Sequence, residues 1–238
     1  MSELYIGLMS GTSMDSVDAA LCEIDTKGCK LISALEYPFP SELKNETLQM
    51  INGTTTLSAV GAIDHRIGLL FGEAANALLK QAQIDATAIS AIGSHGQTLW
   101  HAPIGSYPFS MQLGDASVIA VETHIDVVSD FRSKDIALGG EGAPFAPVFH
   151  QFLFQGLAES VGVLNIGGMA NLSVLQGTLI GFDTGPGNVL LDLWIEREQK
   201  RAYDKEGLWA KEGKVDEALL KELLGDPYFV KAAPKSTG

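Results

Sequence analysis

The chain has 238 residues, of which 46% are hydrophobic, 19% charged and 8% aromatic. This composition is typical of a folded globular protein and excludes global disorder. The 16 Lys and Arg residues and the 29 Asp and Glu residues give a formal net charge of −13 at pH 7, which disfavours nucleic acid and anionic membranes as partners. An anionic ligand would therefore have to be held locally, by backbone amides, a metal ion or a few well-placed cations.

The sequence shows no sign of a targeting or membrane segment. Its first residues carry no basic region followed by a long apolar core, and glycine and asparagine interrupt the uncharged stretch 160–182 too often for a membrane helix. We therefore expect a cytoplasmic protein. Cys22 and Cys29 lack the spacing of a metal or redox pair, so we expect free thiols without a chemical role.

The first half of the chain alternates predicted strands and helices. Residues 11–16 are predicted to form a polar loop between two strands, and residues 94–98 a loop at the end of a strand. This order favours an α/β layer with a mixed sheet. In chain order, the predicted elements are strands at 4–10, 17–24 and 31–37, helices from Ser41 and across 60–78, a strand at 89–93, a helix at 116–123 after Asp115, and a strand at 125–129.

The second half repeats the opening pattern. Strands are predicted at 161–166 and 170–175, around a turn at 167–168, and a third strand enters 181–183. Helices follow from Val189 and over 216–224, and another precedes the strands near 149–154. The repeat predicts two domains, 1–131 and 132–238, which share a pattern but hardly any sequence. The second domain lacks the later strands of the first, so we expect it to be incomplete.

Two loops rich in Gly, Ser and Thr, 11–16 and 184–188, begin where predicted strands end, and each has an Asp beside it. Backbone N–H groups in such loops can hold a polyphosphate, and Asp15 or Asp18 could hold Mg²⁺ through water. The alternative is that both loops are ordinary turns without a ligand.

Three further side chains are candidates for chemistry. Asp183 either leads into a helix as a cap or presents a carboxylate that accepts a proton. His95 follows a predicted strand, in a position used more often for ligand contact than for packing. Arg132 either forms a surface ion pair or contacts an anion. The five histidines share no metal-ligand spacing, so we do not expect a zinc site.

Six motifs together resemble those of the anhydro-N-acetylmuramic acid kinases. They lie in order at 6–15, 93–98, 112–115, 130–132, 165–168 and 181–188. The resemblance implies the superfamily of acetate and sugar kinases, Hsp70 and actin, with a two-domain actin-like (ribonuclease H-like) ATPase fold. It also implies a homodimer.

The implied reaction uses ATP and Mg²⁺ in peptidoglycan recycling. Water attacks the anomeric carbon of 1,6-anhydro-N-acetylmuramic acid while O6 takes the γ-phosphoryl group, which gives N-acetylmuramic acid 6-phosphate and ADP. Phosphoryl transfer of this kind depends mostly on positioning and electrostatic stabilisation.

The resemblance also implies roles for individual residues. Asp183 would be the base that deprotonates water, and Arg132 would stabilise charge around the sugar or the phosphoryl group. His95, Gln97 and Asp115 would line the sugar pocket, and the loop pattern leaves Asp15 and Asp18 as the metal ligands. The implied nucleotide contacts are Gly11, Thr12, Ser13, Met14, Asp15, Ser16, Val17 and Asp18 in the first loop and Gly185 and Gly187 in the second.

Two departures from the family pattern matter. Ser16 stands where the family usually has Gly, so its Cβ would strain the turn if the backbone there needs a positive φ. Family members also continue well past residue 238, and we expect the adenosine-contacting loop and closing helices in that part. An inactive sugar- or phosphate-binding remnant is therefore the alternative to a kinase, and a hydrolase that uses Asp183 and His95 lacks a nucleophile motif.

Overall fold

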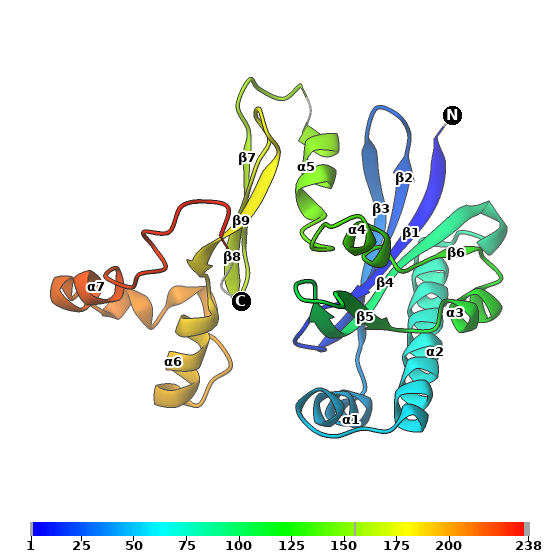
Figure 1. The fold of residues 1–238 in the computed structure, drawn as a ribbon, viewed down its shortest axis with the longest axis horizontal. Coiled ribbons are helices and arrows are strands. Elements are labelled where there is room, and N and C mark those ends of the chain that lie inside the picture. Colours follow the sequence, from blue (N-terminus) through cyan, green and yellow to red (C-terminus); the bar gives the residue numbers. More distant parts are fainter. Residues whose placement is uncertain (1, 155, 236–238) are drawn as a thin grey trace. The chain divides into compact units, whose positions relative to one another are not determined.

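The computed structural model describes residues 2–154 and 156–235 and contains two compact units, Met1–Ala143 and Pro144–Gly238. Figure 1 shows the elements of both units along the chain. Among the described residues, no helix is long and apolar enough to cross a membrane.

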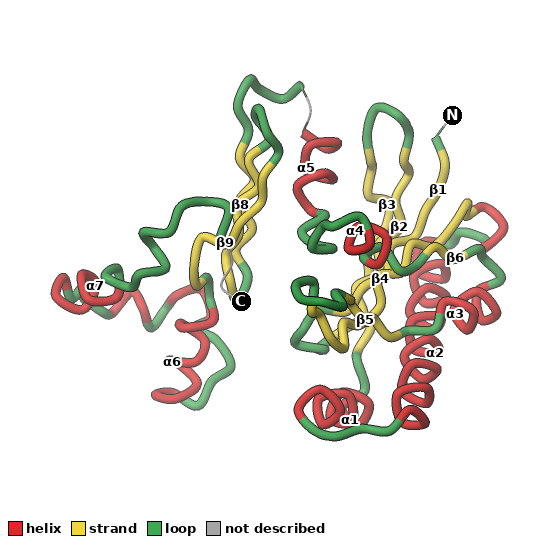
Figure 2. Tube along the Cα trace, viewed as in Figure 1, coloured by secondary structure: helices red, strands yellow, loops and turns green. Residues whose placement is uncertain are grey.

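Unit 1 is built on a mixed six-stranded sheet, drawn in yellow in Figure 2. The strand order is β3-β2-β1-β4-β5, and the sixth strand, β6, also pairs with β4. β1 runs parallel to β4 and β4 parallel to β6, whereas the other pairs are antiparallel, so the predicted mixed sheet is confirmed. The strands are β1 (Glu3–Ser10), β2 (Ser16–Ile24), β3 (Cys29–Pro38), β4 (Ile89–Ala102), β5 (Phe109–Leu113) and β6 (Val127–Val128).

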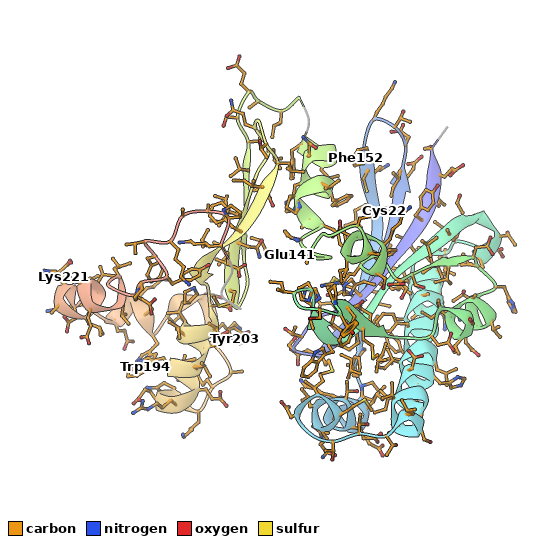
Figure 3. The ribbon with its side chains drawn as sticks, viewed as in Figure 1. Cys22, Glu141, Phe152, Trp194, Tyr203 and Lys221 are labelled. Carbon is orange, nitrogen blue, oxygen red and sulfur yellow. The ribbon has the colours of Figure 1, made fainter. Side chains whose placement is uncertain are left out.

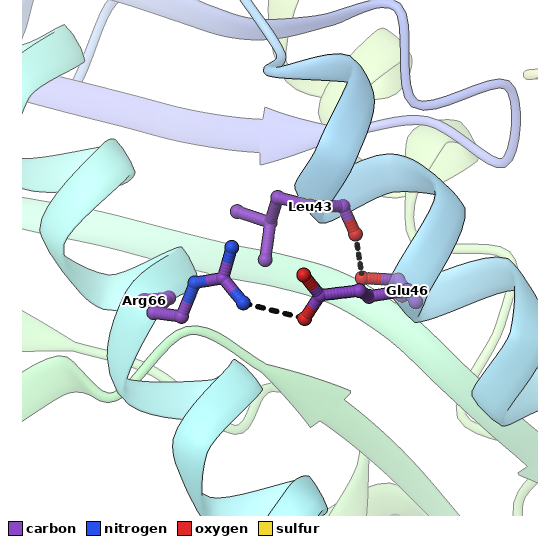
Figure 4. A network of polar contacts seen from close by, with 4 residues as sticks. Leu43, Glu46 and Arg66 are labelled. Carbon is purple, nitrogen blue, oxygen red and sulfur yellow. Dashed lines mark hydrogen bonds and ion pairs between the residues drawn. The ribbon is translucent and has the colours of Figure 1, made fainter.

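Helices cover one face of this sheet and complete the core of unit 1. The long helix α2 buries an apolar stripe that includes Ile67, Phe71 and Leu78, which are all 0% exposed. An ion pair between Arg66 of α2 and Glu46 of α1 links the two helices (Figure 4). The helices of unit 1 are α1 (Ser41–Asn52), α2 (Leu57–Ala82), α3 (Ala116–Thr123), α4 (Ser133–Ala137) and the 3₁₀ turn η1 (Ala86–Ala88).

Three strands of unit 1 differ from their predictions. β4 continues through residues 94–98, which we predicted as a loop, because Gly96 adopts φ +74° and a register shift between Leu8 and Met9 of β1 lets the pairing continue. β5, which the sequence pattern missed, pairs with this extension. β6 contains only two residues of the predicted strand 125–129.

The segment after residue 131 stays with unit 1, although the sequence pattern places the domain boundary at 131/132. The guanidinium of Arg132 is hydrogen-bonded to His95 of β4, and Ile136 of α4 is buried. α4 also packs against β5, which keeps this segment in unit 1.

Unit 2 contains an antiparallel sheet of order β7-β8-β9 and a thin core. Its buried apolar residues, within the described part, are Pro147, Ala170 and Ile195. Trp194 and Tyr203, labelled in Figure 3, are 53% and 58% exposed. The elements are α5 (Ala146–Phe154), β7 (Gly162–Ile166), β8 (Met169–Val174), β9 (Ile180–Pro186), α6 (Val189–Gln199), the 3₁₀ turns η2 (Lys205–Gly207) and η3 (Ala210–Glu212), and α7 (Glu217–Leu223).

The two cysteines are free thiols, as the sequence predicts. Burial, together with the neighbouring Cys29 thiol, raises the pKa of Cys22 to about 11. A thiol with such a pKa is almost entirely protonated at neutral pH and is a poor nucleophile.

Candidate active site

The first glycine-rich loop, between β1 and β2, is anchored by a buried methionine. Met14 is 1% exposed and adopts φ +48°, and its N–H donates to the Gly11 carbonyl over 3.1 Å. The side chains of Met14 and Val17 lie in the core, so these residues can meet a nucleotide only through their backbone. A Cβ at Gly11 would meet no atom within 4 Å, so packing does not explain this glycine. The open space there leaves room for a phosphate to approach the backbone.

Two carboxylates flank this loop. Asp15 pairs with Lys44 of α1, whose Nζ lies 2.8 Å from Oδ1, and hydrogen bonds from Lys44 and Ser13 lower the pKa of the Asp15 carboxyl. Asp18 is exposed and accepts a hydrogen bond from the Ser16 hydroxyl over 3.0 Å. The φ of Ser16 is not positive, so its Cβ does not cause the backbone strain that a positive φ would bring.

The described residues contain no group of three or more His, Cys, Asp or Glu side chains that could hold a metal ion. Asp15 and Asp18 are nevertheless compatible with Mg²⁺ bound to a nucleotide, because this ion usually takes one or two carboxylates and completes its shell with phosphate oxygens and water. In that arrangement Asp15 would have to exchange its contact with Lys44 for the metal.

A polar pocket of about 280 Å³ in unit 1 brings together two of the predicted sugar contacts. His95 and Asp115 line it, and Arg132 is hydrogen-bonded to His95. The rest of the wall includes five hydroxyl or amide side chains and the carboxylates of Asp64 and Asp130, which suit a ligand rich in hydroxyl groups. Among these wall residues are Ser94, Ser110, Gln112, Ser129 and Ser133.

Asp115 has a structural task, and Gln97 is buried, which sequence reasoning did not separate from ligand binding. Asp115 caps α3 by accepting a hydrogen bond from the Ser117 N–H over 2.8 Å. Gln97 is 1% exposed, so contact with a sugar would require its surroundings to open. Its Oε1, like the hydroxyl oxygens of Ser10 and Ser94, is buried without a hydrogen-bond partner in the described part of the chain.

Asp183 lies in the middle of β9 in unit 2, and its backbone is held on both sides. Its N–H donates to the Lys235 carbonyl over 2.9 Å, and its own carbonyl accepts from the Tyr228 hydroxyl over 2.7 Å. Burial and the charge of Asp183 raise the pKa of that hydroxyl. Asp183 is therefore not a helix cap, since α6 begins at Val189, after Asn188.

In the second glycine-rich loop, other atoms of the protein surround the glycines closely. The N–H of Gly187 donates to the Gly168 carbonyl over 2.8 Å, and a Cβ at Gly187 would overlap the carbonyl oxygen of Gly167. A Cβ at Gly185 would lie 2.9 Å from the ring of Phe229. Packing therefore explains both glycines, and a phosphate contact by the Gly187 amide would require its present hydrogen bond to break.

Sequence reasoning missed three side chains that shape these regions. Lys44 pairs with Asp15, and Tyr228 bonds the Asp183 carbonyl. Asp64 of α2 accepts a hydrogen bond from the Gly114 N–H over 2.7 Å and so fixes the turn before Asp115. No local pattern marks these residues, because their partners lie between 29 and 50 positions away in the chain.

Comparison with known proteins decides the family. Residues 3–238 match the family described as anhydro-N-acetylmuramic acid kinase. The chain belongs to this family.

Curated relatives carry the same name. The kinase of Sulfurovum sp. (strain NBC37-1) is 61% identical over 99% of this chain and 66% of its own length. The kinases of Sulfurimonas denitrificans and Vibrio vulnificus (strain YJ016) are each 53% identical over 100% and 99% of this chain and 65% of their own lengths. The chain thus spans slightly less than two thirds of the length of these anhydro-N-acetylmuramic acid kinases.

Among solved structures, the Aquifex aeolicus PPX-GPPA enzyme aligns with 94% of this chain and 64% of its own chain. The sequence identity is 11% and the TM-score 0.38, values too low to establish a shared fold.

Proposed function

We propose that this chain provides the catalytic residues of a kinase that opens 1,6-anhydro-N-acetylmuramic acid with water and phosphorylates O6 at the expense of ATP. The observation that carries this proposal is the 61% identity, over 99% of the chain, to a protein named for that activity. The three relatives compared above are named as kinases, which does not favour the inactive remnant as an alternative.

The nucleotide phosphates are assigned to the first loop, where Gly11 leaves open space and Thr12 and Ser13 are exposed. Backbone N–H groups in such a loop form a concavity for anions. Mg²⁺, held by Asp15 or Asp18 through water, would neutralise charge on the β- and γ-phosphates. The net charge of −13 makes such local neutralisation necessary.

The hydrolytic half of the reaction is assigned to Asp183. A carboxylate within hydrogen-bond reach of a water molecule can take its proton as the oxygen attacks the anomeric carbon. The bond from that carbon to the bridging oxygen breaks, and O6 accepts the γ-phosphoryl group as ADP leaves. The fixed backbone of Asp183, bonded at both its N–H and its carbonyl, supports a defined carboxylate position.

Arg132 is assigned to stabilise negative charge that develops around the sugar or the phosphoryl group. A guanidinium suits this role because it stays charged and offers several N–H donors in a rigid plane. Asp115 and the other walls of the neighbouring polar pocket are assigned to the sugar.

The proposal includes three features of the wider family pattern: an actin-like fold of each unit, a homodimer and a cytoplasmic location. The antiparallel opening of each sheet, β1-β2-β3 in unit 1 and β7-β8-β9 in unit 2, supports the first of these.

Isotope labelling tests the reaction itself. The chain is incubated with ATP, Mg²⁺ and the anhydro-sugar in ¹⁸O-labelled water, and the product is analysed by mass spectrometry and ³¹P NMR. We expect one ¹⁸O atom at the anomeric carbon and phosphate on O6. Phosphorylation without ring opening, or ring opening without phosphate, would contradict the proposal.

A further inference from the structure

The side chains of His95 and Arg132 are hydrogen-bonded to each other within unit 1. His95 Nε2 lies 3.1 Å from Nε and 2.9 Å from Nη2 of Arg132. A guanidinium only donates, so Nε2 must accept and carries no proton. The other ring nitrogen, Nδ1, lies 3.0 Å from the Gly96 carbonyl and therefore bears the proton. The contact fixes one neutral tautomer of His95.

This arrangement leaves the charge of Arg132 unneutralised. Within the described residues, Arg132 forms no ion pair with an Asp or Glu side chain. Its partner is a neutral ring, and two of its five N–H groups are used, which leaves three for another acceptor. Partial burial lowers the pKa of Arg132, although a guanidinium remains charged at any ordinary pH.

The surrounding backbone holds both partners in place. Gly96, with φ +74°, brings its carbonyl beside His95, and a Cβ there would lie 2.5 Å from the Leu113 carbonyl oxygen. The Phe131 ring lies over Gly93 of β4. Asp130 accepts a hydrogen bond from the Ser133 N–H over 3.3 Å and so orders the turn that carries Arg132.

We propose that His95 is a positioning residue, whose neutral imidazole holds the Arg132 guanidinium toward the substrate, rather than a ligand of the sugar. A carboxylate in the same place would also orient Arg132, but it would neutralise the charge that an anionic substrate needs. The catalytic consequence of this role rests on the proposed kinase function, whereas the tautomer and the contact do not.

Protonation of His95 would break the arrangement, because an imidazolium has no acceptor and would repel Arg132. The charged and titratable groups around the pair are Asp64 of α2, Asp115 before α3, Asp130 before α4, His101 of β4 and Glu141. Burial, followed by the charge of Arg132, lowers the pKa of His95, and the Gly96 carbonyl opposes this shift. The neutral form therefore persists below the usual histidine range.

NMR tests the contact in the chain as it stands, without any need for activity. Long-range ¹H–¹⁵N spectra recorded between pH 5 and 8 distinguish the two tautomers and follow the titration of each histidine. We expect His95 to carry its proton on Nδ1 and to titrate below pH 6.5, and Arg132→Gln to raise that pKa. His65→Gln, on the exposed face of α2, is the matched control and should leave the His95 signals unchanged. A proton on Nε2 of His95, or a His95 pKa that does not change in Arg132→Gln, would overturn the proposal.

Kinetics test the catalytic consequence. We expect His95→Phe to lower kcat by roughly 10- to 100-fold through misplacement of Arg132, with little change in KM for ATP. His95→Gln should retain most of the activity that His95→Phe loses, because its amide oxygen can accept a hydrogen bond from Arg132. Since glutamine does not titrate, this variant should also lack the loss of activity at acid pH that protonation of His95 causes. Equal impairment in both variants, or the same acid limb in His95→Gln, would contradict the role.

The two experiments separate the possible failures. If the NMR result holds and no variant or wild-type chain turns over substrate, the proposed function fails and the positioning contact stands. If turnover occurs and the tautomer is wrong, the positioning role fails and the kinase stands.

Discussion

The two glycine-rich loops look alike in sequence but differ in what their glycines do. In the first loop, Gly11 faces open space, and the loop is fixed by the buried side chain of Met14. In the second, the space that a side chain would need is occupied by Phe229 at Gly185 and by the backbone of Gly167 at Gly187. The comparison teaches that glycine in a loop signals a ligand only where neighbouring protein atoms do not already require it.

The two units also differ in how many apolar side chains they bury. The buried cluster of unit 1 joins the sheet to α1, α2 and α3, whereas Ile195 is the one fully buried large side chain in the described part of unit 2. Burial of apolar surface is the main stabilising term in folding. Unit 2 therefore depends more on hydrogen bonds between segments, such as those at Asp183 and Gly187.

The largest effect is expected at Asp183. Asp183→Asn removes the proposed base and should lower turnover by roughly 10²- to 10⁴-fold, while ATP affinity stays within about twofold because the first loop is untouched. A coupled ADP-release assay and calorimetric titration with ATP measure the two quantities. Asp192→Asn, in the first turn of α6, is the control that should retain activity. Undiminished turnover in Asp183→Asn would refute the assignment.

The anchor of the first loop can be removed separately. Met14→Ala deletes a fully buried side chain and should lower the free energy of unfolding by roughly 2–5 kcal/mol. Met9→Ala, on β1 and 44% exposed, is the matched control and should change it by less than about 0.5 kcal/mol. Urea denaturation followed by circular dichroism measures both. Similar losses in the two variants would show that Met14 does not anchor the loop.

A pair of glycine substitutions tests the contrast between the loops. Gly187→Ala forces a Cβ against the Gly167 carbonyl and should destabilise the protein by roughly 1–3 kcal/mol. Gly11→Ala should leave the free energy of unfolding unchanged within about 0.5 kcal/mol and weaken ATP binding about tenfold by blocking the backbone amides. Urea denaturation and calorimetry check these outcomes, and the reverse pattern would break the comparison.

These contrasts also show what the sequence could predict. Apolar runs predicted β1 and β2, apolar periodicity predicted α2, and Asp115 was correctly placed at the start of α3. The extension of β4 through His95 was missed because polar residues and a glycine read as a loop. Only pairing with β1, and from Gln97 onward also with β5, makes them a strand.

The candidate site was predictable only in part. Local sequence context and motif resemblance selected His95 and Arg132, but their contact joins positions 37 apart and depends on the tertiary fold. The same holds for Lys44, which no motif connects to Asp15. The role assigned to Asp183 is a prediction that the first experiment above tests, and the phosphate contacts of Gly185 and Gly187 remain predictions.

The smallest effect is expected at the Lys44–Asp15 pair. Lys44 lowers the pKa of Asp15, so the contribution of the pair to stability is present above the usual carboxyl range near pH 4 and is lost as the pH falls through the lowered pKa. Because Asp15 is 72% exposed, Lys44→Gln should cost only about 0.2–1 kcal/mol at pH 7. Urea midpoints at pH 7 and at decreasing pH below about 4 measure this. A cost that does not decrease as the pH falls would show a role for Lys44 beyond the ion pair.

The most direct test of the central claim is ADP release by this 238-residue chain with ATP and Mg²⁺, in the presence and absence of 1,6-anhydro-N-acetylmuramic acid. We predict release that depends on the anhydro-sugar and disappears in Asp183→Asn. Release at the same rate without the sugar, or no release in its presence from a folded chain, would contradict the account.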